Sequence, residues 1–164
     1  MRNTNDTFIF CALALAAFGI AGNANAETLD LEAAQKLLQD PVMITNDELS
    51  LDPAVQTKQI EAMIEVAFED KGPAVVKRMI KIADCESYGG SHDGMIMHIG
   101  TDGDIVENDA PNSSATGALM VLLVTHREEY TRLDLDPKQV AENIVFGRRL
   151  MDMRESWGHW QFAD

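Results

Sequence analysis

Residues 72–87, GPAVVKRMIKIADCES, contain the clearest helix signals in this chain. Gly72-Pro73 ends one helix and begins the next, because proline fits the first turn of a helix and not its interior. Apolar residues then recur at helical spacing, at Val76, Met79, Ile80 and Ala83. This spacing predicts an amphipathic helix that ends near Glu86-Ser87.

Similar signals predict helices on both sides of this stretch. Asp52-Pro53 pairs an N-cap with a proline at the first helical position, and Asp136-Pro137 repeats the pair before the last long helix. Residues 28–39 form a weaker amphipathic pattern, which is followed by a loop over residues 40–51. The apolar stripes of the two longer helices are Ile60, Met63, Ile64, Ala67 and Phe68, and Val140, Ile144, Gly147 and Met151.

The middle of the chain has a different character. Residues 95–99 and 105–107 flank Asp102-Gly103, a strong signal for a tight turn in a β-hairpin. A polar loop is expected over residues 108–116, and the apolar run 118–124 predicts a buried segment. The predicted fold class is therefore α+β, mostly α-helical, with one small β-hairpin.

The first 26 residues have the parts of a secretory signal peptide. Arg2 supplies the positive charge, residues 8–22 are apolar, and Ala24-Asn25-Ala26 matches the cleavage pattern. The apolar run is shorter than the roughly 20 residues of a membrane-spanning helix, and an uncleaved anchor is the alternative. We expect a periplasmic or secreted chain made of a signal peptide (1–26), an N-terminal helix and loop (27–51) and one domain (52–164).

Charge and cysteine content exclude several classes of protein. The 164 residues carry 13 Lys+Arg against 27 Asp+Glu, a net charge of −14, which argues against binding to nucleic acid. The same charge could steer a basic protein partner towards the chain. Removal of residues 1–26 leaves Cys85 alone, which excludes a disulfide framework. Its apolar neighbours predict that Cys85 is a core residue.

Glu86 is the strongest candidate for chemistry. It closes an apolar helix and precedes a glycine-rich turn, so it could project from a rigid element into a cleft. Partial desolvation would favour the protonated acid that general acid catalysis requires. The alternative is a glutamate solvated at a helix end. Ser87 lacks the context of a catalytic serine and is expected to bond locally or to orient Glu86.

No metal site is expected. Asp102 and Asp104 lack the alternating ligands and final glutamate of a calcium loop, so a plain turn is favoured. The zinc ligands that could be drawn from Cys85, His92 and His98 follow no known spacing, which favours a fortuitous scatter.

Four segments resemble, in order, the lytic transglycosylase (lysozyme-like) superfamily. Residues 82–87, IADCES, resemble that family's I-A-x-C-E-S, in which a Glu-Ser pair ends an apolar helix. Residues 117–120 fall at its G-x-M-Q block, and residues 142–150 resemble its N-I-x-x-G-x-x-x-L helix. Trp157 and Trp160 fall near its closing W-x-x-W segment. The resemblance covers roughly residues 55–164.

The resemblance implies a lysozyme-like domain that cleaves the β-1,4 bond between N-acetylmuramic acid and N-acetylglucosamine in peptidoglycan, without a cofactor. Glu86 would protonate the glycosidic oxygen and then act as base on the C6 hydroxyl. The substrate's N-acetyl group would stabilise the positive centre, so one carboxylate suffices, unlike in most glycoside hydrolases. Contacts to the glycan strand would come from Ser87, Tyr88, Met120, Asn143 and Trp160.

One position departs from the family pattern. The glutamine of the G-x-M-Q block falls at Met120, where a thioether replaces an amide that donates and accepts hydrogen bonds. The alternative to an enzyme is therefore a catalytically weak or inactive lysozyme-like module that binds a glycan or a protein.

Overall fold

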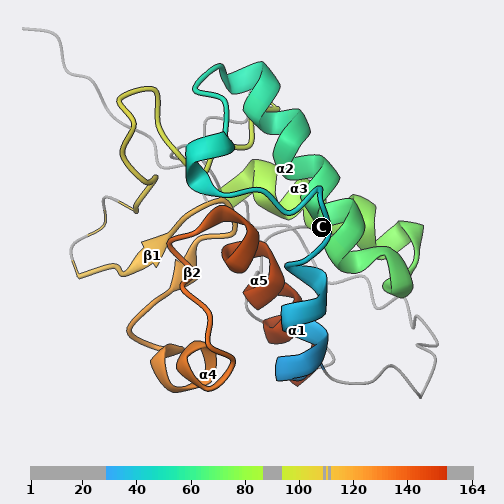
Figure 1. Cartoon of the computed structure of the whole chain (residues 1–164). Coiled ribbons are helices and arrows are strands. Elements are labelled where there is room, and N and C mark those ends of the chain that lie inside the picture. The colour runs from blue at the N-terminus through green and yellow to red at the C-terminus, as the bar shows by residue number, and fades with distance from the viewer. Residues whose placement is uncertain (1–28, 87–93, 109, 111, 155–164) are drawn as a thin grey trace, which may run out of the picture.

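The structure, a computed structural model, describes residues 29–86, 94–108, 110 and 112–154 (Figure 1). This part of the chain is mostly helical with a small two-stranded antiparallel sheet, which confirms the predicted fold class. The α-helices are α1 (Leu31–Leu37), α2 (Pro53–Phe68), α3 (Pro73–Glu86), α4 (Arg127–Arg132) and α5 (Val140–Arg154). The other elements are two 3-10 helices, η1 (Asn46–Glu48) and η2 (Glu69–Lys71), and two strands, β1 (Ala115–Thr116) and β2 (Val121–Leu122).

Local chemistry sets the start of α2 and of α3 where the sequence predicts it. Asp52 caps α2, since its Oδ1 accepts hydrogen bonds from the backbone N–H of Ala54 (2.9 Å) and Val55 (3.2 Å). Gly72 has a φ of 87°, which only glycine adopts readily, and it separates η2 from α3. The two helices therefore follow each other after a sharp break.

The hydrophobic core forms where α2 packs against α5. Both helices bury large side chains completely or nearly so: Ile60, Met63, Ile64 and Phe68 from α2, and Ile144, Val145, Phe146 and Leu150 from α5. Figure 1 shows α3 beside α2, and α1 beside the lower part of α5. Ala34 of α1 is fully buried, so the residues before the predicted domain pack on the same core.

The sheet lies in a segment for which the sequence predicts none. Ala115 pairs with Leu122 and Thr116 with Val121, and the chain turns between them at Gly117 and Met120. The prediction that residues 118–124 are buried throughout is wrong, because Leu122 is 41% exposed and Val124 is 79% exposed. A strand and a turn there leave alternate side chains at the surface.

The hairpin predicted around Asp102-Gly103 is reduced to a turn with a single bridge. Gly103 N–H donates to the Gly100 carbonyl (2.9 Å), so the tight turn is confirmed. Ile99 and Ile105 form an isolated bridge rather than paired strands.

The predicted start of the last helix is also wrong by a few residues. Pro137 lies in a turn in which Gln139 N–H donates to the Asp136 carbonyl (2.8 Å), and α5 begins only at Val140. The Asp136 side chain accepts a bond from Lys138 N–H (3.0 Å), so it caps this turn. The short helix α4 has no counterpart in the prediction.

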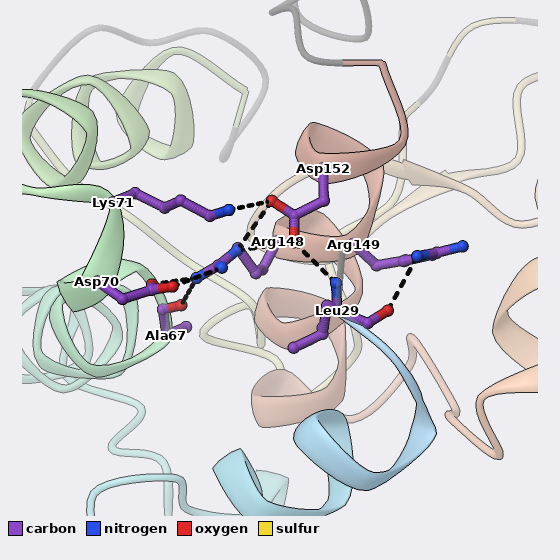
Figure 2. Close-up of polar contacts among 7 residues, drawn as sticks. All are labelled: Leu29, Ala67, Asp70, Lys71, Arg148, Arg149 and Asp152. Carbon is purple, nitrogen blue, oxygen red and sulfur yellow. Dashed lines mark hydrogen bonds and ion pairs between the residues drawn. The ribbon is translucent and has the colours of Figure 1, made fainter. Parts of the chain in front are cut away.

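A buried network around Arg148 and Asp152 joins the first described residue to both core helices (Figure 2). Arg148 of α5 is 4% exposed and donates to the Ala67 carbonyl (2.9 Å), to both carboxylate oxygens of Asp70, and to Asp152. Asp152 also pairs with Lys71 Nζ (2.7 Å) and accepts from Leu29 N–H (3.0 Å). This network fixes η2 and the start of the described chain on α5.

No helix within residues 29–86 and 94–154 is long and apolar enough to cross a membrane. The predicted signal peptide lies outside the described residues.

Candidate functional site

Glu86 is the last residue of α3 and lies on its buried face. Met79, one helical heptad before Glu86, is fully buried, as is Ala83 one turn before it. The Glu86 side chain is half-buried, and this burial raises the pKa of its carboxyl above the ordinary value. The negative end of the helix dipole acts in the same direction.

The Glu86 carboxyl also has no polar partner among the described residues, which stop at Glu86 and resume at Gly94. Within the part of the chain that the structure describes, neither a hydrogen bond nor an ion pair reaches it, and desolvation is the cause of the shift in its pKa. A neighbouring cation would instead favour the ionised form. The arrangement suits a group that must carry a proton near neutral pH.

Three of the predicted contact residues, Ser87, Tyr88 and Trp160, lie outside the described residues, as does His92. Cys85 is half-buried and forms no disulfide among the described residues, so the prediction that it is a core residue is wrong. It precedes Glu86 by one residue and is turned about 100° from the buried face of the helix.

Met120 and Asn143 are brought together by the turn between β1 and β2. Met120 is half-buried, with a φ of 45°, and it ends a turn in which its N–H donates to the Gly117 carbonyl (3.0 Å). Behind this turn, Asn143 of α5 accepts from Leu119 N–H (3.0 Å). The side chain of Asn143 therefore fixes the backbone that presents Met120.

The amide of Asn143 is fully buried and makes further bonds. Its Nδ2 donates to the carbonyls of Thr116 (3.1 Å) and Pro137 (2.8 Å). The predicted contact of Asn143 with a glycan would require this amide to leave the backbone groups that it satisfies. Its place in the structure is that of a positioning residue for the turn.

His98 also holds this turn, and no signal in the sequence indicates that role. The fully buried ring accepts from Ala118 N–H at Nδ1 (3.1 Å) and, at Nε2, bonds to the Lys138 carbonyl (2.9 Å). These partners assign the neutral tautomer with the proton on Nε2. Burial lowers the pKa of His98 to about 4, against the opposing effects of the Lys138 carbonyl and Asp136.

Acid should therefore weaken the folded state through His98. The folded pKa lies below that of the unfolded chain, so unfolded molecules bind the proton first and stability falls as pH drops below about 6.5. We expect a loss of about 2–3 kcal/mol from this group between about pH 7 and 4.5. Urea denaturation of the wild type and of His98→Gln checks it: the variant should lose less over this range, and equal losses would contradict the assignment.

The remaining metal candidates form no site in the described residues. No cluster of three histidine, cysteine, aspartate or glutamate side chains occurs there. Asp102 Oδ1 accepts from Asp104 N–H (3.1 Å), which is a turn contact. Both ring nitrogens of His98 are occupied by backbone groups.

Comparison of the chain with protein-family models, curated proteins and solved structures gives no match.

Proposed function

We propose that the chain is a peptidoglycan lytic transglycosylase with a lysozyme-like domain, exported to the periplasm or beyond the cell, and that Glu86 is its general acid and base. The proposal rests on the half-buried Glu86 carboxyl at the end of α3, which has no polar partner among the described residues and whose pKa is raised by burial. The order of the sequence segments that resemble this family supports it.

In the proposed reaction one carboxyl serves both steps. Protonated Glu86 donates its proton to the glycosidic oxygen as the bond to C1 of N-acetylmuramic acid breaks. The neighbouring N-acetyl group of the substrate stabilises the positive charge at C1. The Glu86 carboxylate then removes the C6 hydroxyl proton while O6 attacks C1, which leaves a 1,6-anhydro product and restores the acid.

Glu86→Gln should reduce peptidoglycan cleavage by at least about 100-fold, because the amide keeps the shape and removes the titratable proton. The assay is digestion of purified peptidoglycan, with the anhydro-muropeptides identified by mass spectrometry. Glu65→Gln, on the exposed side of α2, is the matched control and should cleave normally. Equal cleavage by wild type and Glu86→Gln would refute the role of Glu86.

Wild-type cleavage should fall as pH rises through the raised pKa of Glu86.

The same substitution should stabilise the folded protein at neutral pH. Because burial raises the pKa of Glu86, the ionised carboxylate destabilises the folded state at pH values above that pKa. Below the ordinary pKa of glutamate the carboxyl is protonated, and this destabilisation is absent. Glu86→Gln should therefore raise the melting temperature at pH 7, with a smaller gain at pH 4. Glu65→Gln should leave the melting temperature unchanged at both values, and a Glu86→Gln variant that melts below wild type at pH 7 would contradict this.

Met120 favours a second candidate, a lysozyme-like module that binds glycan strands or a basic protein without cleaving. His98 and Asn143 hold the turn that presents the Met120 thioether. Residues 117–120 carry no side-chain amide that could replace the glutamine of the family's G-x-M-Q block. Sedimentation with insoluble peptidoglycan separates the two: binding without muropeptide release from folded wild type would support the module.

A further inference from the structure

Leu29 is anchored to α5 by its backbone and by its side chain (Figure 2). Its N–H donates to Asp152 Oδ2 (3.0 Å), and its carbonyl accepts from Arg149 Nη1 (3.0 Å). Leu29 is 5% exposed and belongs to the hydrophobic core. It therefore cannot be drawn away from α5 without breaking both hydrogen bonds and exposing its side chain to water.

The two side chains that anchor Leu29 are themselves held by ion pairs. Asp152 pairs with Lys71 of η2 (2.7 Å), and Arg149 pairs with Glu129 of α4 (2.6 Å). Directly after the anchor the chain enters α1, which is capped by the side chain of Asp30. Parts of η2, α4, α5 and α1 thus surround the point at which the described chain begins.

The bond at which the signal peptide would be cut lies close to this anchor along the chain. The pattern Ala24-Asn25-Ala26 predicts a cut between Ala26 and Glu27. Only residues 27 and 28 separate that bond from the Leu29 nitrogen. Because an extended chain spans at most about 3.6 Å per residue, the bond lies within about 7 Å of the Leu29 nitrogen.

A peptidase must enclose the bond that it cuts, with substrate residues held extended in a cleft on both sides of that bond. The walls of such a cleft are built from helices and sheets. Even a single layer of either is about 10 Å thick, which is more than the distance available. The walls therefore collide with α5 and its neighbours while Leu29 is anchored.

We infer that anchoring of Leu29 and removal of the signal peptide exclude each other, so the cut must come before the start of the chain docks on α5. The cut adds water across the peptide bond and leaves a carboxylate on Ala26 and an ammonium group on Glu27. A precursor that docks Leu29 first keeps its signal peptide. The inference rests on the proposed export of the chain and not on the chemistry proposed for Glu86.

Digestion of the full-length precursor with purified signal peptidase in detergent micelles tests this order. The precursor is digested once folded and once in urea that unfolds it, with a peptide substrate to correct for the effect of urea on the peptidase. Mass spectrometry should find the cut between Ala26 and Glu27 in the unfolded precursor, and the folded precursor should be cut at least about tenfold more slowly. Equal rates would overturn the inference while leaving the signal peptide in place. An unfolded precursor that is not cut there would overturn the export signal as well.

Two variants show whether distance and anchoring are the cause. About ten glycine and serine residues inserted between Thr28 and Leu29 move the bond away by about 17 Å and should make the folded precursor as cleavable as the unfolded one. Leu29→Ala weakens the anchor and should speed cleavage of the folded precursor about tenfold. Leu31→Ala is the control, because Leu31 is 45% exposed. Circular dichroism checks that each variant is folded, and a folded insertion variant that stays uncut would overturn the inference.

Discussion

Arg148→Met should lower the free energy of unfolding by about 3–5 kcal/mol, because it removes one partner from a buried ionic network. Arg148 is 4% exposed, and its guanidinium bonds to the Ala67 carbonyl and to two carboxylates. Methionine fills much of the volume and satisfies none of these acceptors. Among the described residues, Asp152, whose side chain is 3% exposed, would keep Lys71 and the Leu29 N–H as partners. Urea denaturation followed by circular dichroism measures the loss.

Arg132→Met is the matched control for this substitution. Arg132 pairs with Glu129 one turn away, but its side chain is 51% exposed, so its loss should cost less than about 1 kcal/mol. Arg148→Lys should lie between the two, since an ammonium retains the charge and cannot reproduce the forked geometry of a guanidinium. Equal stability of Arg148→Met and Arg132→Met would show that the network is not a major source of stability.

Gly117→Ala should destabilise the fold by about 3 kcal/mol or more, because two penalties act together. Gly117 has a φ of 75°, in the left-handed region. An added Cβ would also lie 2.5 Å from His98 Cε1 and 2.6 Å from Asn143 Nδ2. Both side chains are held by hydrogen bonds to the backbone, so neither can withdraw without leaving a buried group unsatisfied. Thermal and urea denaturation of the variant measure the effect.

Gly103→Ala separates the two penalties. Gly103 has a φ of 88°, and an added Cβ there would have no atom within 4 Å. Only backbone strain remains, so the loss should be about 1–2 kcal/mol. A Gly117→Ala variant no less stable than Gly103→Ala would mean that His98 and Asn143 adapt more easily than their bonds indicate.

The helices that the sequence predicts well are those whose ends are decided locally. Asp52 caps α2 with its own side chain, and the positive φ of Gly72 separates η2 from α3. Neighbouring residues therefore suffice to place both boundaries. The position of Glu86 at the end of α3 follows from the same local pattern.

The elements that were missed depend on distant partners. The start of α5 is displaced because Asn46 Oδ1 accepts from Val140 N–H (2.8 Å) and Asn143 engages the Pro137 carbonyl. The turn between the strands β1 and β2 uses a positive φ at both Gly117 and Met120, and an apolar run does not reveal the one at Met120. The role of His98 likewise arises from residues brought near by folding, since its ring bonds to Ala118 N–H and to the Lys138 carbonyl.

The bond between Leu29 and Asp152 has a consequence for the order in which the chain can fold. These two residues are 123 positions apart, and α2 likewise packs against α5, the last helix of the described chain. During synthesis, neither contact can form until nearly all of the chain has emerged, because the partner has not yet been made. Until then α1 and α2 have exposed apolar faces, so the nascent chain should require a holding chaperone until its last helix arrives.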